Sequence, residues 1–232
     1  RWNHPVHGLV QPNMFLPAIQ QTAVMIKLGE WVTSRAIKDM QEFEKSGHDM
    51  KVAVNIGAEH FSAPDFVSSL VTKCKSHKFS PDRLQIEVTE NIMDASRDIF
   101  KKTVQKLQKN GFVVAIDDFG SGFSNLTRIA SVPVDIIKLD CSLVRDSVSA
   151  KRVQVMMETA IKMAHALDSA VIVEGVETLE QVKIAEKAGA NALQGYYFSK
   201  PLPVSELNTW LECRTQSSPQ AQYQELKKAI AC

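Results

Sequence analysis

Ionisable and amide side chains recur where short apolar runs end along this 232-residue chain. Most of these runs are rich in Val, Ile or Leu. The polar residues that end them or directly follow them are Asn55, Glu87, Glu90, Asp117, Asp118, Lys138, Asp140, Glu174, Glu177 and Gln194. Ligands of parallel α/β folds bind at the carboxyl ends of the strands. The spacing therefore predicts carboxylates, two amides and one lysine around a common mouth.

The residue types indicate what this mouth would bind. Carboxylate and amide oxygens, with no His or Cys among them, suit a hard cation such as Mg²⁺ or Mn²⁺. Adjacent Asp117 and Asp118 can bridge two metal ions or divide between them, and two neighbouring metal ions assist in-line attack on a phosphodiester. Without a cation, such close carboxylates would raise each other's pKa. Lys138 would neutralise developing charge or orient the attacking water.

Several of these residues also have a purely structural interpretation. Asn55 would suit the cap of the turn that follows it, and Lys138 would suit an ion pair with a neighbouring strand's carboxylate. Glu90 and Glu177 fit loop anchors better than metal ligands. Glu87 stands inside an apolar run, where an unpaired carboxylate is costly, so a site is favoured there. The set as a whole favours a site more strongly than any one member.

Strand-like and helical patterns alternate over most of the chain. The strand-like runs are Val52–Asn55, Leu84–Val88, Phe112–Asp117, Val134–Leu139, Ala170–Glu174 and Ala192–Gln194. The helical patterns between them are Phe66–Lys75, Ser96–Lys109, Arg152–Leu167 and Leu179–Ala188. Alternation of this kind predicts an α/β fold with a parallel sheet, either open and doubly wound or a (β/α)8-type barrel. Two further helical stretches and no strand are expected between Pro12 and Gly47.

Composition excludes several classes of protein. The net charge is +1 and no block of like charge stands out, so neither DNA nor an anionic membrane is an expected partner. No apolar run approaches the roughly 18 residues of a membrane helix. The four cysteines form no CxxC pair, which favours a reducing, cytoplasmic location.

A series of motifs in a fixed order resembles a known family. The motifs are RWNHP from Arg1, VNIGA from Val54, EVTE from Glu87, DDFGSGFSNL from Asp117, KLD from Lys138, EGVE from Glu174 and QGYYFSKPL from Gln194. Together, and up to about Leu211, they resemble the EAL domain family.

The resemblance implies a modified TIM (β/α)8-type barrel that hydrolyses cyclic di-GMP to linear pGpG with Mg²⁺ or Mn²⁺ in a two-metal site. Residues 1–212 would form this domain without its first two strands, and residues 213–232 would form a C-terminal tail or helix. Homodimerisation, fusion to GGDEF or sensory domains and a cytoplasmic location are implied as well, and the parent protein could carry a membrane anchor elsewhere.

The same resemblance assigns roles to individual residues. Metal ligands would be Asn55, Glu87, Asp117 and Asp118. Lys138 would contact the nucleophilic water, and Glu174 would act as general base or through a bound water. Arg1, Gln194 and Asp140 would touch the ligand. Glu90 would brace the DDFG loop, and Glu177 would anchor its own loop.

One departure bears on activity. The glutamate that names the family would stand four residues before Arg1, outside this chain. We therefore expect the chain by itself to be weakly active or inactive, although its parent would be an active phosphodiesterase. The first alternative is a module that binds cyclic di-GMP without cleaving it. A third reading, an aldolase-like or phosphatase-like barrel, predicts a Schiff-base lysine without the surrounding carboxylates.

Overall fold

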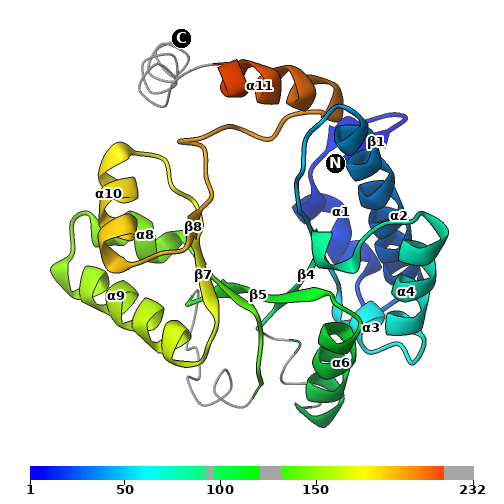
Figure 1. Cartoon of the computed structure of the whole chain (residues 1–232), viewed down its shortest axis with the longest axis horizontal. Coiled ribbons are helices and arrows are strands. Elements are labelled where there is room, and N and C mark those ends of the chain that lie inside the picture. Colours follow the sequence, from blue (N-terminus) through cyan, green and yellow to red (C-terminus); the bar gives the residue numbers. More distant parts are fainter. Residues whose placement is uncertain (91, 93–96, 121–131, 217–232) are drawn as a thin grey trace. The chain divides into compact units, whose positions relative to one another are not determined.

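The computed structural model describes residues 1–90, 92, 97–120 and 132–216, which form two compact units (Figure 1). Unit 1 comprises Arg1–Gln41 and Lys51–Val114, and unit 2 comprises Glu42–Met50 and the chain from Ala115 onward. The predicted helix start at Ser96, the glycine-rich loop from Ser121 to Leu126 and the tail beyond Gln216 lie outside the described residues.

Six parallel strands follow one another in chain order in one sheet. They are β3 Val52–Asn55, β4 Leu84–Thr89, β5 Val113–Phe119, β6 Ile136–Leu139, β7 Ala170–Val173 and β8 Ala192–Leu193. All six predicted runs are strands, and the α/β class with a parallel sheet is confirmed. Strands β4 to β7, whose residues are mostly buried, were recognisable because strands buried on both faces read as near-continuous apolar runs. The prediction for the third run was wrong in one respect, because β5 continues through Asp117 and Asp118 to Phe119 instead of ending at the aspartates.

Unit 1 begins with an antiparallel pair of short strands, β1 Trp2–His4 and β2 Gly8–Val10. Helices follow, as the sequence predicts for Pro12–Gly47: α1 Pro12–Ile19 and α2 Ala23–Lys45, whose last turn belongs to unit 2. The remaining helices of unit 1 are α3 Ala58–Phe61, α4 Phe66–Ser76, the short 3-10 helix η1 Pro81–Arg83 and α6 Arg97–Lys109. The β1–β2 pair was not predicted, since its exposed three-residue strands carry no apolar pattern.

Apolar spacing explains how the helices of unit 1 pack. In α6, Phe100, Val104 and Leu107 recur at helical spacing and are buried, whereas the intervening lysines are exposed. Such a stripe drives one face of a helix into the core. The ring of Phe61 meets those of Phe66 and Phe100 at centroid distances of 5.6 and 5.1 Å.

Unit 2 carries helices on the outer side of β7 and β8 (Figure 1). They are α8 Cys141–Ser147, α9 Lys151–Ala166 and α10 Leu179–Ala188. Met157, Ile161 and Ala164 form the buried stripe of α9. A capping box of Thr178 and Gln181 starts α10, satisfying backbone N–H groups that would otherwise lack partners. The last helix among the described residues, α11 Val204–Gln216, begins before residue 213, so the predicted tail starts inside a helix. The division at 212/213 stays a prediction.

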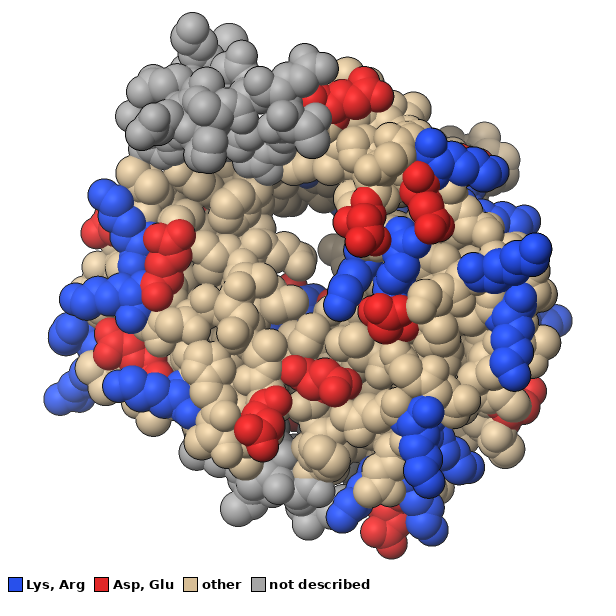
Figure 2. Space-filling view, in the orientation of Figure 1, with Lys and Arg blue, Asp and Glu red and all other residues tan. Residues whose placement is uncertain are grey.

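Charge is dispersed over the surface. In Figure 2, Lys and Arg side chains alternate with Asp and Glu over the outer helices of unit 2, in keeping with the net charge of +1. Among the helices that the structure describes, none is both long and apolar enough to cross a membrane.

Candidate metal and ligand site

Lys138 lies at the centre of a buried ion-pair cluster in unit 2. Its Nζ lies 2.8 Å from Asp117 Oδ1 and 2.8 Å from Glu174 Oε1. Strand β6 carries the lysine, β5 carries Asp117, and Glu174 directly follows β7, so three neighbouring strands build the cluster. The predicted ion pair with a neighbouring strand is confirmed on both sides. A lysine that is 3% exposed needs such partners, because burying an unpaired charge is costly.

An irregularity in β5 places both aspartates near this cluster. The register against β6 pairs Ile116 with Ile137 and Phe119 with Leu139, so two residues of β5 oppose Lys138 alone. Asp118 takes the left-handed conformation, with φ of 58°. Consecutive side chains of a regular strand point to opposite faces, whereas a bulge with one left-handed residue re-aims a side chain. The bulge therefore allows adjacent carboxylates to serve one site.

Three carboxylates come close enough to share a cation. Ligand oxygens of Asp117, Asp118 and Glu174 all lie within 4.8 Å of one another. Burial raises the pKa of Asp118, as do the charges of Asp117 and Asp140, while Lys138 opposes the rise. An all-oxygen donor set whose charges repel one another fits a hard dication, which would remove the repulsion. The acidic cluster thus agrees with the predicted metal chemistry and leaves the identity of the ion open.

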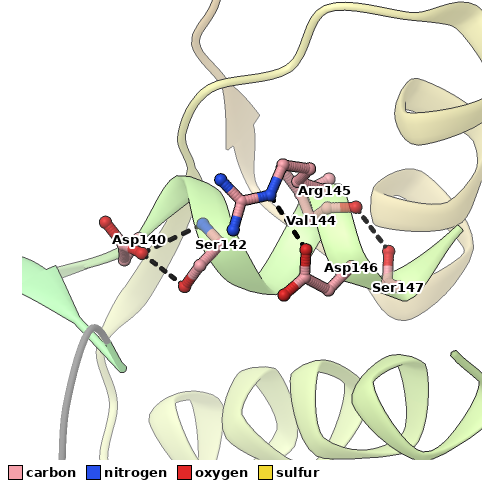
Figure 3. A network of polar contacts seen from close by, with 6 residues as sticks. All are labelled: Asp140, Ser142, Val144, Arg145, Asp146 and Ser147. Atoms are coloured by element: carbon pink, nitrogen blue, oxygen red, sulfur yellow. Dashed lines mark hydrogen bonds and ion pairs between the residues drawn. The ribbon is translucent and has the colours of Figure 1, made fainter.

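Asp140 is the N-cap of α8 (Figure 3). Its Oδ1 accepts hydrogen bonds from the backbone N of Ser142 at 2.9 Å and from Ser142 Oγ at 2.5 Å. Burial acts to raise the pKa of Asp140, but these bonds and those from Cys141 outweigh it, so the pKa is lowered. This carboxylate is therefore ionised at neutral pH and fixes the start of α8 beside the cluster.

A pocket of about 410 Å³ opens in unit 2 next to the cluster. It is lined by Asp118, Asp140, Cys141, Arg145, Glu174, Gly175, Glu177, Gln181, Gln194, Gly195 and Tyr196. Five of these are predicted site residues, which the fold brings together from the ends of β5, β6, β7 and β8. Cys141, Arg145 and Tyr196 were not predicted as site residues. The first two lie on α8, a seven-residue helix too short to show a periodic pattern; the Asp-x-Ser capping sequence was the available signal.

Two glycines shape the pocket wall. Gly175 has φ of 67°, and a Cβ there would lie 2.2 Å from Cys141 Cβ. A Cβ on Gly195 would lie 2.1 Å from the backbone oxygen of Val176. The backbone segments approach so closely because Val176 N donates to the Gln194 carbonyl at 3.0 Å, and Tyr197 N donates to the Val176 carbonyl at 2.9 Å. The EGVE and QGYYFSKP motifs thus form one hydrogen-bonded wall.

Glu177 precedes α10 at the pocket, and its predicted role as a loop anchor stays a prediction. Its N–H donates to Gln181 Oε1 at 2.7 Å, at the entrance to α10, while the exposed carboxylate lines the pocket.

The remaining predicted site residues belong to unit 1. Asn55 and Glu87 are register partners on β3 and β4. Glu87 is 3% exposed and accepts a hydrogen bond from Gln85 Nε2 at 2.8 Å. Asn55 does not cap α3, whose N-cap is Gly57. Arg1 is exposed before β1 and Glu90 follows β4. Their proposed ligand and anchor roles stay predictions.

The fold and the site define a parallel α/β domain of TIM-barrel type with an acidic, metal-type cluster at the carboxyl ends of its strands. The EAL domain model matches residues 1–201. The chain belongs to the EAL domain family.

Similar proteins include multidomain signalling proteins. The chain is 33% identical to the oxygen sensor protein DosP of Escherichia coli, over 91% of this chain and 26% of DosP. It is 30% identical to the cyclic di-GMP phosphodiesterase PdeR of the same organism, over 90% of this chain and 32% of PdeR. The chain therefore spans about a quarter to a third of the length of these relatives.

Solved structures agree with the fold. The PaMucR phosphodiesterase in complex with c-di-GMP superposes with a TM-score of 0.83 at 31% identity, covering 89% of this chain and 84% of that one. This likeness confirms the predicted TIM-barrel class.

Proposed function

We propose that this domain catalyses metal-dependent hydrolysis of cyclic di-GMP to linear pGpG. The observation that carries the proposal is the cluster of Asp117, Asp118 and Glu174 around Lys138. It lies where parallel α/β folds bind their ligands, in a chain whose relatives include named cyclic di-GMP phosphodiesterases.

Asp117, Asp118 and Glu174 would hold the metal in unit 2, and Asn55 and Glu87 would contribute further ligands from unit 1. Mg²⁺ or Mn²⁺ bound there would supply Lewis-acid stabilisation of the phosphodiester and lower the pKa of a bound water. The oxygen-only donor set and the raised pKa of Asp118 support this role.

The chain's own residues would position the substrate and handle charge and protons. In the hydrolysis, a water oxygen bonds to phosphorus and one P–O ester bond breaks. Glu174 accepts the proton that the water loses, directly or through another water, and the leaving oxygen is protonated from solvent. Lys138 stays between Asp117 and Glu174, offsets their charge and orients the attacking water. Gln194 and Asp140, on the pocket wall, contact the ligand, as does Arg1.

The alternative function is binding of cyclic di-GMP without cleavage. The retained acidic cluster disfavours it, because a receptor that does not cleave its ligand has no need for crowded, mutually repelling carboxylates. The residue four positions before Arg1 in the parent protein discriminates further: glutamate there supports catalysis, and alanine or lysine supports the binding module.

The direct test incubates the protein with cyclic di-GMP and either Mg²⁺, Mn²⁺ or EDTA, and separates the products by chromatography. Appearance of pGpG with metal and its loss with EDTA are expected. A longer form that carries glutamate four positions before Arg1 is expected to turn over faster than a form that carries alanine there. Binding of cyclic di-GMP without any product from either form would favour the receptor.

Homodimerisation, fusion to GGDEF or sensory domains, and a cytoplasmic location accompany this proposal. They rest on the family resemblance. Sedimentation of the protein with and without cyclic di-GMP would test the dimer.

A further inference from the structure

Among the residues that the structure describes, Arg145 is the one basic residue that lines the unit 2 pocket. It lies on α8, one helical turn after Cys141, and none of the motifs that identify the family includes it. The same pocket exposes carboxylates of Asp118, Asp140, Glu174 and Glu177. A guanidinium among so many carboxylates offers hydrogen-bond donors where every other charged group offers acceptors.

Only a weak interaction holds the Arg145 side chain in place. Its Nε lies 2.9 Å from Asp146 Oδ1, and the two side chains are 66% and 50% exposed. Ion pairs with this exposure between neighbouring residues contribute little to stability. A ligand can therefore recruit the guanidinium at small cost.

The guanidinium points toward the start of α8, where Asp140 lies. In Figure 3 its two Nη atoms lie on the Ser142 and Asp140 side of the group, opposite the Asp146 contact. This direction follows from helix geometry, because helical side chains lean toward the N-terminus of their helix. The planar pair of donors thus projects over the start of α8, where Asp140 borders the pocket.

The pocket has the pattern of groups that a guanine base requires. Guanine presents two acceptors, O6 and N7, which pair with a bidentate arginine. Its N1–H and N2–H₂ groups are donors, which pair with carboxylate or amide oxygens such as those of Glu177 and Gln194. The ring of Tyr196, 53% exposed at the pocket, offers a surface for stacking. Adenine replaces O6 with an amino donor, which would face the donors of Arg145.

We propose that Arg145 is a specificity-determining residue that reads O6 and N7 of one guanine of the ligand. The inference deepens the proposed function and rests on it, since it requires a guanine nucleotide in the unit 2 pocket. Phosphate recognition by the same guanidinium is the competing chemistry. The favoured reading is the base, because the phosphate under attack is expected at the acidic cluster.

Titration calorimetry with cyclic di-GMP, cyclic di-IMP and cyclic di-AMP in the presence of EDTA, where no cleavage is expected, tests this inference. Inosine keeps O6 and N7 and lacks the 2-amino group, whereas adenine lacks O6. Arg145→Met is expected to weaken cyclic di-GMP and cyclic di-IMP about tenfold each and to leave any binding of cyclic di-AMP unchanged. Arg145→Lys keeps the charge without the planar fork and is expected to restore little of the loss.

The matched control is Arg152→Met, which removes another exposed arginine, on α9, that does not line the pocket. It should bind all three nucleotides like the unsubstituted chain. Equal melting temperatures of the variants would separate binding effects from misfolding.

Unchanged affinity of Arg145→Met for cyclic di-GMP would overturn the inference and leave the proposed function standing. Equal weakening of all three nucleotides would overturn base reading in favour of phosphate contact. If the unsubstituted chain binds no cyclic di-GMP although it is folded, both the proposed function and this inference fail.

Discussion

The two units contribute site residues in different ways. In unit 1, Asn55 and Glu87 stand on regular strands, as direct register partners. In unit 2, Asp117 and Asp118 share a bulge that contains a left-handed residue, and Lys138 pairs with two carboxylates. Regular strands deliver one side chain each to an edge, whereas adjacent ligands need a local distortion. The comparison teaches that the charge-dense cluster of unit 2 depends on a local distortion, whereas unit 1 presents single polar side chains on regular strands.

The largest expected effect concerns whether both units bind the same metal. Asp117→Asn is expected to abolish metal-dependent cleavage, a loss of at least about a hundredfold. Glu87→Gln is expected to do the same if unit 1 supplies ligands to one shared site. Titration of Mn²⁺ followed by thermal melting gives the readout, because a ligand that binds only the folded state raises its stability.

Asp117→Asn and Glu87→Gln together test whether residues of both units bind the same metal ion. If Asp117→Asn loses the Mn²⁺-dependent rise in melting temperature and Glu87→Gln retains it, the metal site is confined to unit 2. Retained cleavage by Asp117→Asn would refute the metal assignment altogether.

Next in size is the removal of the central lysine. Lys138→Met leaves the buried Asp117 without its partner beside the half-buried Glu174, and breaking a buried pair costs about 3 kcal/mol. We expect denaturant unfolding without metal to show this loss, and added Mg²⁺ or Mn²⁺ to recover part of it by supplying positive charge. The exposed Lys187 of α10 provides the control, Lys187→Met, which should unfold like the unsubstituted chain. Equal stability of Lys138→Met would mean that the ion pairs are dispensable.

The wall between the two motifs of unit 2 can be tested through Gly195. Gly195→Ala puts a Cβ against the Val176 backbone, and overpacking of this kind costs about 2 kcal/mol. Displacement of Gln194 should weaken cyclic di-GMP binding as well. Gly47→Ala is a partial control, because its Cβ would meet nothing within 4 Å, although its positive φ adds a backbone strain that Gly195 does not have. Unaltered binding by Gly195→Ala would show that the wall does not position the ligand.

The smallest expected effects concern the pH dependence of folding stability, which should differ between substitutions of Asp118 and of Asp140. The pKa of Asp118 is raised above its ordinary 3.8, so its ionisation destabilises the metal-free fold as the pH rises through the window above 3.8. Asp118→Asn should therefore be the more stable protein at neutral pH without metal, and this advantage should vanish below pH 3.8.

The pKa of Asp140 is shifted in the opposite direction, so its contribution to stability changes with pH in the opposite sense. Its lowered pKa contributes stability that is present above 3.8 and is lost as the pH falls through the lowered value. Asp140→Ala also removes an N-cap, at a cost of about 1 kcal/mol at neutral pH. Urea unfolding between pH 3 and 7 compares the two, and parallel profiles for both variants would contradict the assigned pKa directions.

Local patterns in the sequence determined most of the fold. Strands β4 to β7 were recognisable because strands buried on both faces are apolar throughout, and α10 was predicted with its observed bounds because a glycine follows it. Polar residues at the ends of those strands identified the site, and the ordered motifs identified the family. Each of these signals lies within a few consecutive residues.

Tertiary structure decided what depends on contacts between distant segments. The bulge at Asp117 and Asp118 is defined by the register of β5 against β6. The ion-pair partners of Lys138 are set by the order of β5, β6 and β7 in the sheet. Arg145 and Tyr196 join the site because α8 and the segment after β8 meet at one pocket. No pattern in the sequence encodes these positions locally, since each results from packing between residues tens of positions apart.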